Sequence, residues 1–215
     1  SRSRTSVAQK TYQSSCTPTL STTFSGKLLA PNSKFRLKRT TFAIQTANVY
    51  RCITATVIER NDAEHEVLLT VEYDIDNSKA RDGYSQRFQF RCENGSDLYN
   101  IMQSSGTIGA PDGNYKFLNT DSACVVLEAV AYSLPADDAV VAEGRNADES
   151  DQATKRGQCL LWVKDDEANA PDRCCLHMFQ ELCAHAEVRQ GFSDAGCQIE
   201  ASKDTAAVQS DTSPK

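Results

Sequence analysis

The chain has 215 residues, enough for one domain with tails and a substantial core. Its net charge of −6 argues against general binding to the phosphate backbone of nucleic acids. Among nine cysteines there is no Cys-x-x-Cys pair, so neither a zinc ribbon nor a thioredoxin-like site is expected. Disulfides formed in an oxidising, extracellular compartment are the simpler interpretation. The longest apolar run, 123–130, contains Glu128 and is too short to span a bilayer.

The N-terminal residues 1–31 are rich in Ser and Thr and contain few apolar side chains. Such a composition is typical of an extended arm, which a disulfide through Cys16 would tether to the rest of the chain. The folded domain is predicted to span residues 32–200. Residues 201–215 are predicted to be a disordered tail.

Period-two patterns predict several strands in the first part of the domain. Residues 34–39 alternate apolar and basic side chains, and residues 52–59 are rich in β-branched ones. The segments 66–75 and 84–92 alternate over their whole length, with a polar turn predicted at 76–83. The residues expected to share one face are Val67, Leu69, Val71, Tyr73 and Ile75 in one segment and Tyr84, Gln86, Phe88 and Phe90 in the other.

Shorter strands are predicted at 98–103 and 115–118, and longer ones at 124–132 and 158–164. The residues between the last two strands, 134–157, are acidic and Ala-rich without a clear period, and they predict a long exposed loop. Turns are expected at 104–106 and 111–114.

One helix follows the last strand and starts near Pro171, because proline is favoured in the first helical turn. Its expected apolar stripe consists of Leu176, Phe179, Leu182, Cys183 and Ala186. About eight successive strands and one late helix predict an all-β fold: an eight-stranded antiparallel up-and-down barrel with the helix packed outside. A barrel of this size has room for one small ligand.

Several features occur together in chain order: 119–126 on one strand, Leu161 and Trp162 on the next, 171–179 with its cysteines, and Cys197. Through them the chain resembles tick salivary lipocalins of the histamine-binding group. The resemblance covers roughly residues 32–200. It implies a lipocalin barrel with a C-terminal helix, secretion in tick saliva, and a binding protein rather than an enzyme.

The resemblance also implies three disulfides, by matching position. They tie the second strand to the C-terminal segment, the strand at 124–132 to the helix, and the N-terminal arm to the helix. The implied pairs are Cys52 with Cys197, Cys124 with Cys175, and Cys16 with Cys174.

Three cysteines are not placed by the resemblance. We expect Cys159 to pair with Cys183, because the helix could cover the strand that Cys159 begins. Cys92 is then unpaired, so the protein is either a monomer or a dimer linked through Cys92. The sequon at Asn94 could carry an N-linked glycan, which also suits secretion.

Amine-binding members of the family have an Asp directly after the strand cysteine and a Glu two residues before the Trp. Here these positions hold Val125 and Leu160. A buried cation needs a carboxylate partner, so both replacements disfavour a scavenger of histamine or serotonin. Glu128, Glu72 or Asp74 would have to substitute for the missing carboxylates.

The same replacements favour an apolar pocket for a fatty acid, eicosanoid or sterol. A basic residue near its mouth, Arg36, Arg39, Arg87 or Arg91, could meet a ligand carboxylate. The alternative is that the apolar side chains simply fill the barrel. The candidate ligand-binding residues are Val125, Leu127, Leu160, Trp162, Phe35, Leu37, Phe88 and Phe90.

The first functional hypothesis is sequestration of a hydrophobic or amphipathic host mediator, which would modulate inflammation or immunity. The second is a protein-binding inhibitor of complement or leukocytes that uses the loops of the barrel, and the third is an amine scavenger. No nucleophile motif and no cofactor is expected. His177, Glu181 and His185 share a helix face, but such spacing is common on solvated helices, and no metal site is predicted.

Overall fold

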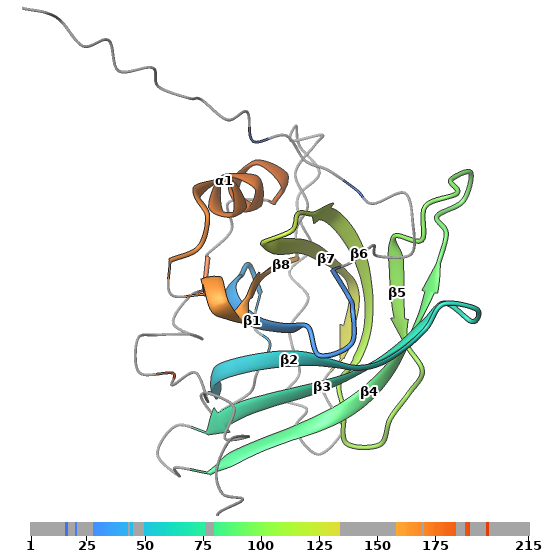
Figure 1. The fold of residues 1–215 in the computed structure, drawn as a ribbon, viewed down its shortest axis with the longest axis horizontal. Helices are drawn as coiled ribbons and strands as arrows, with labels where there is room; N and C mark the ends of the chain where they lie inside the picture. Colours follow the sequence, from blue (N-terminus) through green and yellow to red (C-terminus); the bar gives the residue numbers. More distant parts are fainter. Residues whose placement is uncertain are drawn as a thin grey trace, which may run out of the picture.

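In the computed structural model, all described strands belong to one closed antiparallel barrel (Figure 1). Neighbouring strands pair in chain order, and the first strand closes the barrel by pairing with the last. This confirms the predicted lipocalin-like fold. The strands are β1 (Lys34–Thr40), β2 (Tyr50–Asn61), β3 (Glu66–Ile75), β4 (Arg81–Arg91), β5 (Ile101–Ser104), β6 (Asp112–Thr120), β7 (Cys124–Ser133) and β8 (Cys159–Lys164).

The predicted loop 134–157, the tail 201–215 and most of the arm 1–31 lie outside the described part of the chain. No described helix is both long and apolar enough to cross a membrane. The structure describes residues 16, 20, 28–42, 44, 50–75, 80–133, 158–168, 170–183, 188–189 and 197.

Two predicted turns prove to be partly strand. Asp112 and Gly113 were expected in a turn, but they pair with Ser133 and Tyr132 at the start of β6. Likewise Gly83 pairs with Glu72 inside β4. Turn-favouring residues misled the prediction at both places, because pairing with the neighbouring strand outweighs local turn propensity.

The strands of the barrel place alternate side chains inside, as period-two patterning requires. The inner cluster includes Phe35, Leu37, Val67 and Phe88, each at most 5% exposed. Residues 28–33 precede β1, and the Asn32 amide donates to the carbonyl oxygen of Val57, 2.8 Å away. Leu28 and Leu29 join the inner cluster from this segment, and each is less than a tenth exposed. The segment therefore covers the end of the barrel at which β1 begins.

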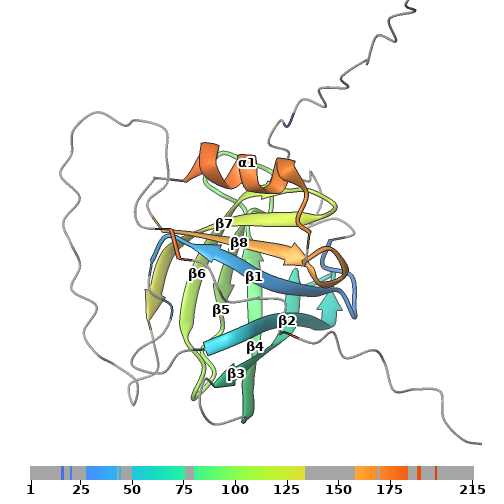
Figure 2. The ribbon, with the colours of Figure 1, turned by 90° about the vertical axis from the view of Figure 1, so that its left-hand side faces the viewer.

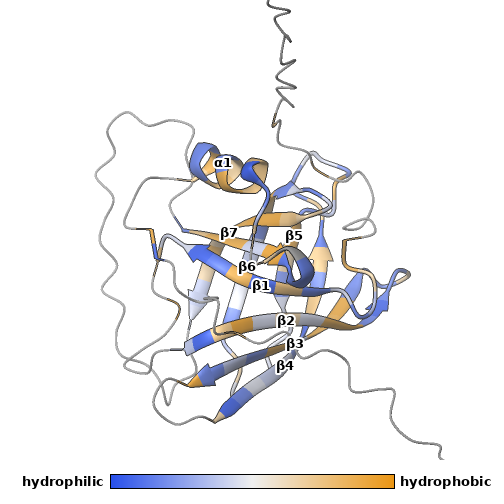
Figure 3. Cartoon of the chain, turned by 60° about the vertical axis from the view of Figure 1, so that its left-hand side comes forward, coloured by the Kyte–Doolittle hydropathy of each residue, from blue (hydrophilic) through white to orange (hydrophobic). Residues whose placement is uncertain are grey.

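A second apolar cluster lies outside the barrel, between β7, β8 and helix α1 (Arg173–Leu182). Figure 2 shows α1 lying along β7 and β8, and Figure 3 shows hydrophobic residues on α1 and on β7 beneath it. Val126, Leu161 and Val163 are fully buried in this cluster. Because β7 and β8 are covered on both faces, they read as continuous apolar runs rather than as alternating patterns.

Helix α1 begins at Arg173, slightly later than the predicted start near Pro171. Pro171 precedes the N-cap residue Asp172, whose carboxylate accepts a hydrogen bond of 2.7 Å from the amide of Cys174. The most deeply buried helix residues are Cys175, Met178 and Phe179, whereas Leu176 and Leu182 are half-buried. Ala186, the last residue of the expected stripe, lies outside the described residues.

Two disulfides fasten the ends of α1 to the barrel: Cys175 to Cys124 on β7, and Cys183 to Cys159 on β8. Eight residues of helix span about 12 Å. Cys159 pairs with Glu128, four residues along β7 from Cys124, and four residues of strand span about 13 Å. The helix therefore fits between its two covalent anchors without bending.

The remaining disulfides join Cys16 to Cys174 and Cys52 to Cys197. All four pairs are those that the sequence analysis expects. Cys92, in the connection between β4 and β5, keeps a free and exposed thiol.

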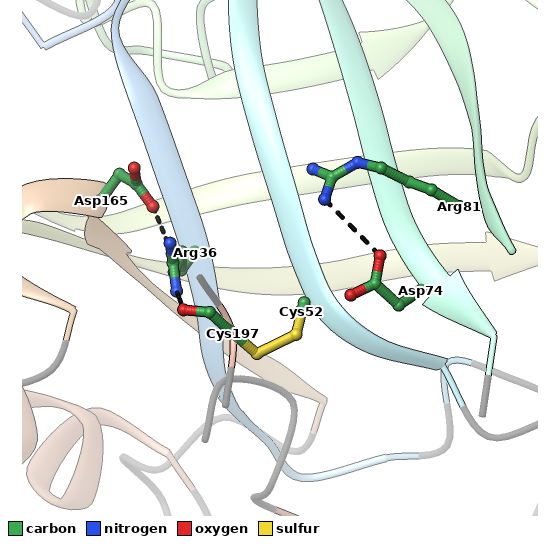
Figure 4. Close-up of a disulfide and its surroundings, with 6 residues drawn as sticks. All are labelled: Arg36, Cys52, Asp74, Arg81, Asp165 and Cys197. Carbon is green, nitrogen blue, oxygen red and sulfur yellow. Dashed lines mark hydrogen bonds and ion pairs between the residues drawn. A yellow bond between two sulfur atoms is a disulfide. The ribbon is translucent and has the colours of Figure 1, made fainter. Parts of the chain in front are cut away.

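A buried ion pair lies on the outer side of β1 (Figure 4). Arg36 is 2% exposed, and its guanidinium donates to the carboxylate of Asp165, in the 3-10 turn η2 (Asp165–Glu167). It also donates to the carbonyl oxygen of Cys197 at 3.1 Å. Arg36 thus links β1, η2 and the residue that is disulfide-bonded to Cys52.

Candidate ligand-binding cavity

A cavity of about 150 Å³ lies inside the barrel, and all eight strands contribute side chains to it. This volume is roughly ten times what one water molecule requires on the same measure. The barrel is therefore not filled by its own side chains, which was the alternative that the sequence left open.

Most of the predicted ligand-binding residues line this cavity. Phe90 does not: it is 2% exposed and packs on Phe117, with ring centroids 5.6 Å apart, in the same apolar cluster. The predicted residues that do line the cavity are Phe35, Leu37, Phe88, Val125, Leu127, Leu160 and Trp162.

Val125 and Leu160 face the cavity directly. They lie on adjacent strands, since Val125 pairs with Trp162 and Leu127 pairs with Leu160. At the two positions where amine-binding relatives would have carboxylates, this barrel therefore presents a continuous aliphatic wall.

Five tyrosines that were not predicted as site residues line the cavity toward one end of the barrel. Four of them lie near strand ends that meet at this end: the start of β2 and β4 and the end of β3 and β7. The period-two pattern places two of them on an inward face, but only barrel closure brings all five together. The group, called here the tyrosine cluster, consists of Tyr50, Tyr73, Tyr84, Tyr115 and Tyr132.

Burial raises the pKa of the Tyr84, Tyr115 and Tyr132 phenols above their ordinary value. For Tyr84 the other four phenols of the cluster add to the rise in pKa, because a phenolate would be repelled by a second one nearby. These hydroxyls are therefore neutral throughout the physiological pH range.

Two polar side chains of the cavity are fixed by hydrogen bonds to loops. The Tyr132 hydroxyl donates to the carbonyl oxygen of Ile44 at 3.0 Å, and its ring meets that of Phe42 edge-on. Gln86 is 2% exposed and donates to the carbonyl oxygen of Pro111 at 2.9 Å. Ile44 follows β1 and Pro111 precedes β6, so these bonds hold Ile44 and Pro111 against the tyrosine end.

None of the four arginines expected near the mouth lines the cavity. Arg36 is buried outside the barrel, as described above. Arg87 points outward, 3.5 Å from Glu66 and 3.6 Å from Glu59. Arg91 is exposed on the last residue of β4, and Arg39 is absent from the cavity wall. None of the four arginines therefore belongs to the cavity wall, and Arg36 and Arg87 alternate with the inward-facing residues of β1 and β4.

The carboxylates considered as substitutes for the amine site also lie outside the cavity. Glu72 and Asp74 alternate with cavity-lining residues on β3 and approach Arg81 at 3.4 and 3.5 Å. Glu128 pairs with Cys159 and is likewise absent from the wall.

The described residues of the other predicted sites are exposed on the surface. Asn94 is exposed in the turn between β4 and β5, two residues from the free thiol of Cys92. His177 and Glu181 are exposed on α1, while His185 lies outside the described residues. Within the described ranges, no three His, Cys, Asp or Glu side chains gather in a way that could hold a metal ion.

Comparison with known proteins identifies the family. Residues 24–136 match the family described as tick histamine binding protein. A search of curated protein sequences found no match.

Three solved structures match this chain at 13% sequence identity. The AM182 serotonin complex matches with a TM-score of 0.52 over 81% of this chain and 91% of AM182. Japanin from Rhipicephalus appendiculatus, bound to cholesterol, gives 0.46 over 74% of this chain and 91% of japanin. The siderocalin Ex-FABP gives 0.47 over 79% of this chain and 98% of its own. The family match spans more than half of the sequence, and the chain belongs to the tick histamine-binding protein family, a group of small-ligand-binding lipocalins that are not enzymes.

Proposed function

We propose that this protein is a secreted tick salivary lipocalin that sequesters a hydrophobic or amphipathic host mediator inside its barrel and so modulates inflammation or immunity. The observation that carries the proposal is the cavity wall: Val125 and Leu160 stand where amine-binding relatives would have carboxylates, and both face the cavity. Sequestration needs affinity and abundance but no chemical step.

The cavity supports useful affinity for an apolar molecule. Burying about 300 Å² of ligand hydrocarbon contributes roughly 7 kcal/mol before the cost of lost translational and rotational freedom. The barrel is closed by strand pairing, and two disulfides fasten α1 to its outer side, so little further ordering is required when a ligand enters.

Secretion is supported by four disulfides and by the family, since such bonds persist in oxidising compartments. The exposed sequon at Asn94 fits the same route, and we expect it to carry a glycan.

The amine alternative finds less support. AM182 shares the fold and was solved in complex with serotonin, but no carboxylate is among the described residues that line this cavity. An ammonium group would be buried there without a countercharge, which costs several kcal/mol. The protein-inhibitor alternative needs no cavity at all, so an open cavity favours a small ligand.

The test is native mass spectrometry of protein from secreting eukaryotic cells, followed by organic extraction. We expect a bound apolar molecule that is lost in Leu160→Asp and Val125→Asp. Ile58→Asp is the matched control, because Ile58 is 45% exposed on the outer side of β2. Near-ultraviolet circular dichroism establishes that each variant is folded. If the protein is empty and takes up no added fatty acid, leukotriene, sterol or amine, the scavenger proposal fails and a protein target becomes the better hypothesis.

A further inference from the structure

The polar side chains that the described residues contribute to the cavity wall are all uncharged. They are the phenols of the tyrosine cluster, the amide of Gln86 and the indole N–H of Trp162. Among the described lining residues there is no Asp, Glu, Lys, Arg or His. The described part of the cavity wall therefore offers hydrogen bonds to a ligand but no countercharge.

The hydroxyls of the tyrosine cluster differ in what they can still offer. The proton of Tyr132 is committed to the carbonyl oxygen of Ile44, so its oxygen can only accept a further bond. Tyr84 and Tyr115 make no hydrogen bond through their hydroxyls with the described part of the chain, and each can donate and accept. A ligand hydroxyl can donate to the Tyr132 oxygen and can also bond to Tyr84 and Tyr115. A ligand carbonyl can accept hydrogen bonds from Tyr84 and Tyr115.

A charged headgroup fits this environment poorly. Two phenols can hydrogen-bond a carboxylate, but they supply no positive charge to offset its desolvation. A fatty acid would have to enter in its protonated form. Its affinity would then fall roughly tenfold for each pH unit above the pKa of its carboxyl group. An alkylamine would be penalised in the opposite direction, since it is protonated at neutral pH.

We propose that the cavity selects a neutral lipid bearing a hydroxyl or carbonyl group, and that Tyr84, Tyr115 and Tyr132 hold this group at the tyrosine end. The inference rests on the proposed function and narrows its ligand class: alcohols and other uncharged amphiphiles bind in preference to acids and amines of equal chain length.

The protein carries its own reporter for the test. Trp162 is the only tryptophan in the sequence, and it lines the cavity, so its fluorescence follows occupancy directly. Decanol, decanoic acid and decylamine share one chain and differ only in the headgroup. Each is titrated at about pH 7.4 and about pH 5.

We expect decanol to bind with the same affinity at both pH values and more tightly than the other two at pH 7.4. Decanoic acid should tighten by at least tenfold toward pH 5. An acid that binds at pH 7.4 as tightly as the alcohol overturns the selection of neutral ligands while leaving the scavenger proposal intact. Failure of all three ligands to bind overturns both.

Variants test the role of the phenols. Tyr84→Phe, Tyr115→Phe and Tyr132→Phe keep the ring and remove one hydroxyl each. A neutral hydrogen bond is worth roughly a two- to tenfold change in affinity, and we expect a loss of this size for decanol. Tyr99→Phe is the control, because Tyr99 stacks on His65, with ring centroids 3.9 Å apart, and does not line the cavity. Unchanged decanol affinity in all three cavity variants would show that these phenols do not hold the headgroup.

Discussion

The phenol ring of Tyr115 lies directly over Gly113, so that a Cβ atom on Gly113 would come within 2.4 Å of the Tyr115 hydroxyl oxygen. Residues i and i+2 of a strand point to the same face, and only glycine leaves room for the ring to lean along β6. Gly113 thus directs the hydroxyl of Tyr115 toward the tyrosine end of the cavity.

Gly113→Ala is therefore expected to displace the Tyr115 ring. Overpacking of this kind costs about 1–3 kcal/mol of unfolding free energy, and the displaced hydroxyl should weaken decanol binding. Urea denaturation and Trp162 fluorescence measure the two effects. In a Tyr115→Leu background the same alanine should cost much less, because leucine lacks the distal ring atoms. An equal cost in both backgrounds would mean that something other than the ring requires glycine.

The raised pKa values of Tyr84, Tyr115 and Tyr132 predict a loss of stability at alkaline pH. Their folded-state pKa values lie above the unfolded-state value of about 10, so the unfolded chain releases these protons first as pH rises. The stability that the protonated phenols contribute is complete below about pH 10 and is lost as pH rises further, by about 1.4 kcal/mol per pH unit for each phenol.

Urea midpoints measured at about pH 9, 10 and 11 test this expectation, with phenolate absorbance as the second readout. The native protein should show fewer ionised phenols near pH 11 than the seven tyrosines in the sequence would give. The triple variant Tyr84→Phe, Tyr115→Phe, Tyr132→Phe should have a shallower decline above pH 10. A wild-type protein with the same slope as the triple variant would contradict the assignment.

The buried pair of Arg36 with Asp165 and the exposed pair of Arg81 with Asp74 provide a comparison within one barrel (Figure 4). Arg36→Met leaves the Asp165 carboxylate, only 15% exposed, and the carbonyl of Cys197 without their partner. We expect a loss of about 3 kcal/mol, the lower end of the range for breaking a buried pair.

Arg81→Met should cost at most about 1 kcal/mol, because Arg81 and Asp74 are 35% and 43% exposed. The double variant Arg36→Met, Asp165→Leu should recover part of the loss, since no charge is then left unpaired. Guanidinium denaturation of the four proteins gives the comparison. Equal losses for the two single variants would show that the Arg36 pair is no more important than a surface contact.

Cys92 is expected to be the one reactive thiol of the folded protein. With four disulfides intact, native protein treated with N-ethylmaleimide should gain the mass of a single adduct, and Cys92→Ser should gain none. Non-reducing electrophoresis of untreated protein reports whether the thiol instead forms a Cys92-linked dimer. Labelling at any of the other eight cysteines would contradict the disulfide pattern.

Much of the fold follows from local patterns. The alternation in 66–75 and 84–92 and the apolar runs at 124–132 and 158–164 predict the strands, and the inward faces of β3 and β4 contain the residues expected there. The exception is Ile75 at the end of β3, which neither lines the cavity nor joins the inner cluster. Such faces are set by the period of the backbone itself, so they can be predicted without knowing what each strand pairs with. For the same reason, seven of the eight predicted cavity residues line the cavity.

The sequence by itself determined that this chain forms a barrel of alternating strands, and which side of each long strand is apolar. Only the tertiary structure decided where polar groups meet. Arg36 reads as a surface arginine, yet it is buried against Asp165, 129 residues away. The tyrosine cluster joins β2, β3, β4, β6 and β7, and no local pattern reports that their ends converge. The physical reason is that a residue's face depends on its own backbone, whereas its partners depend on how the barrel closes.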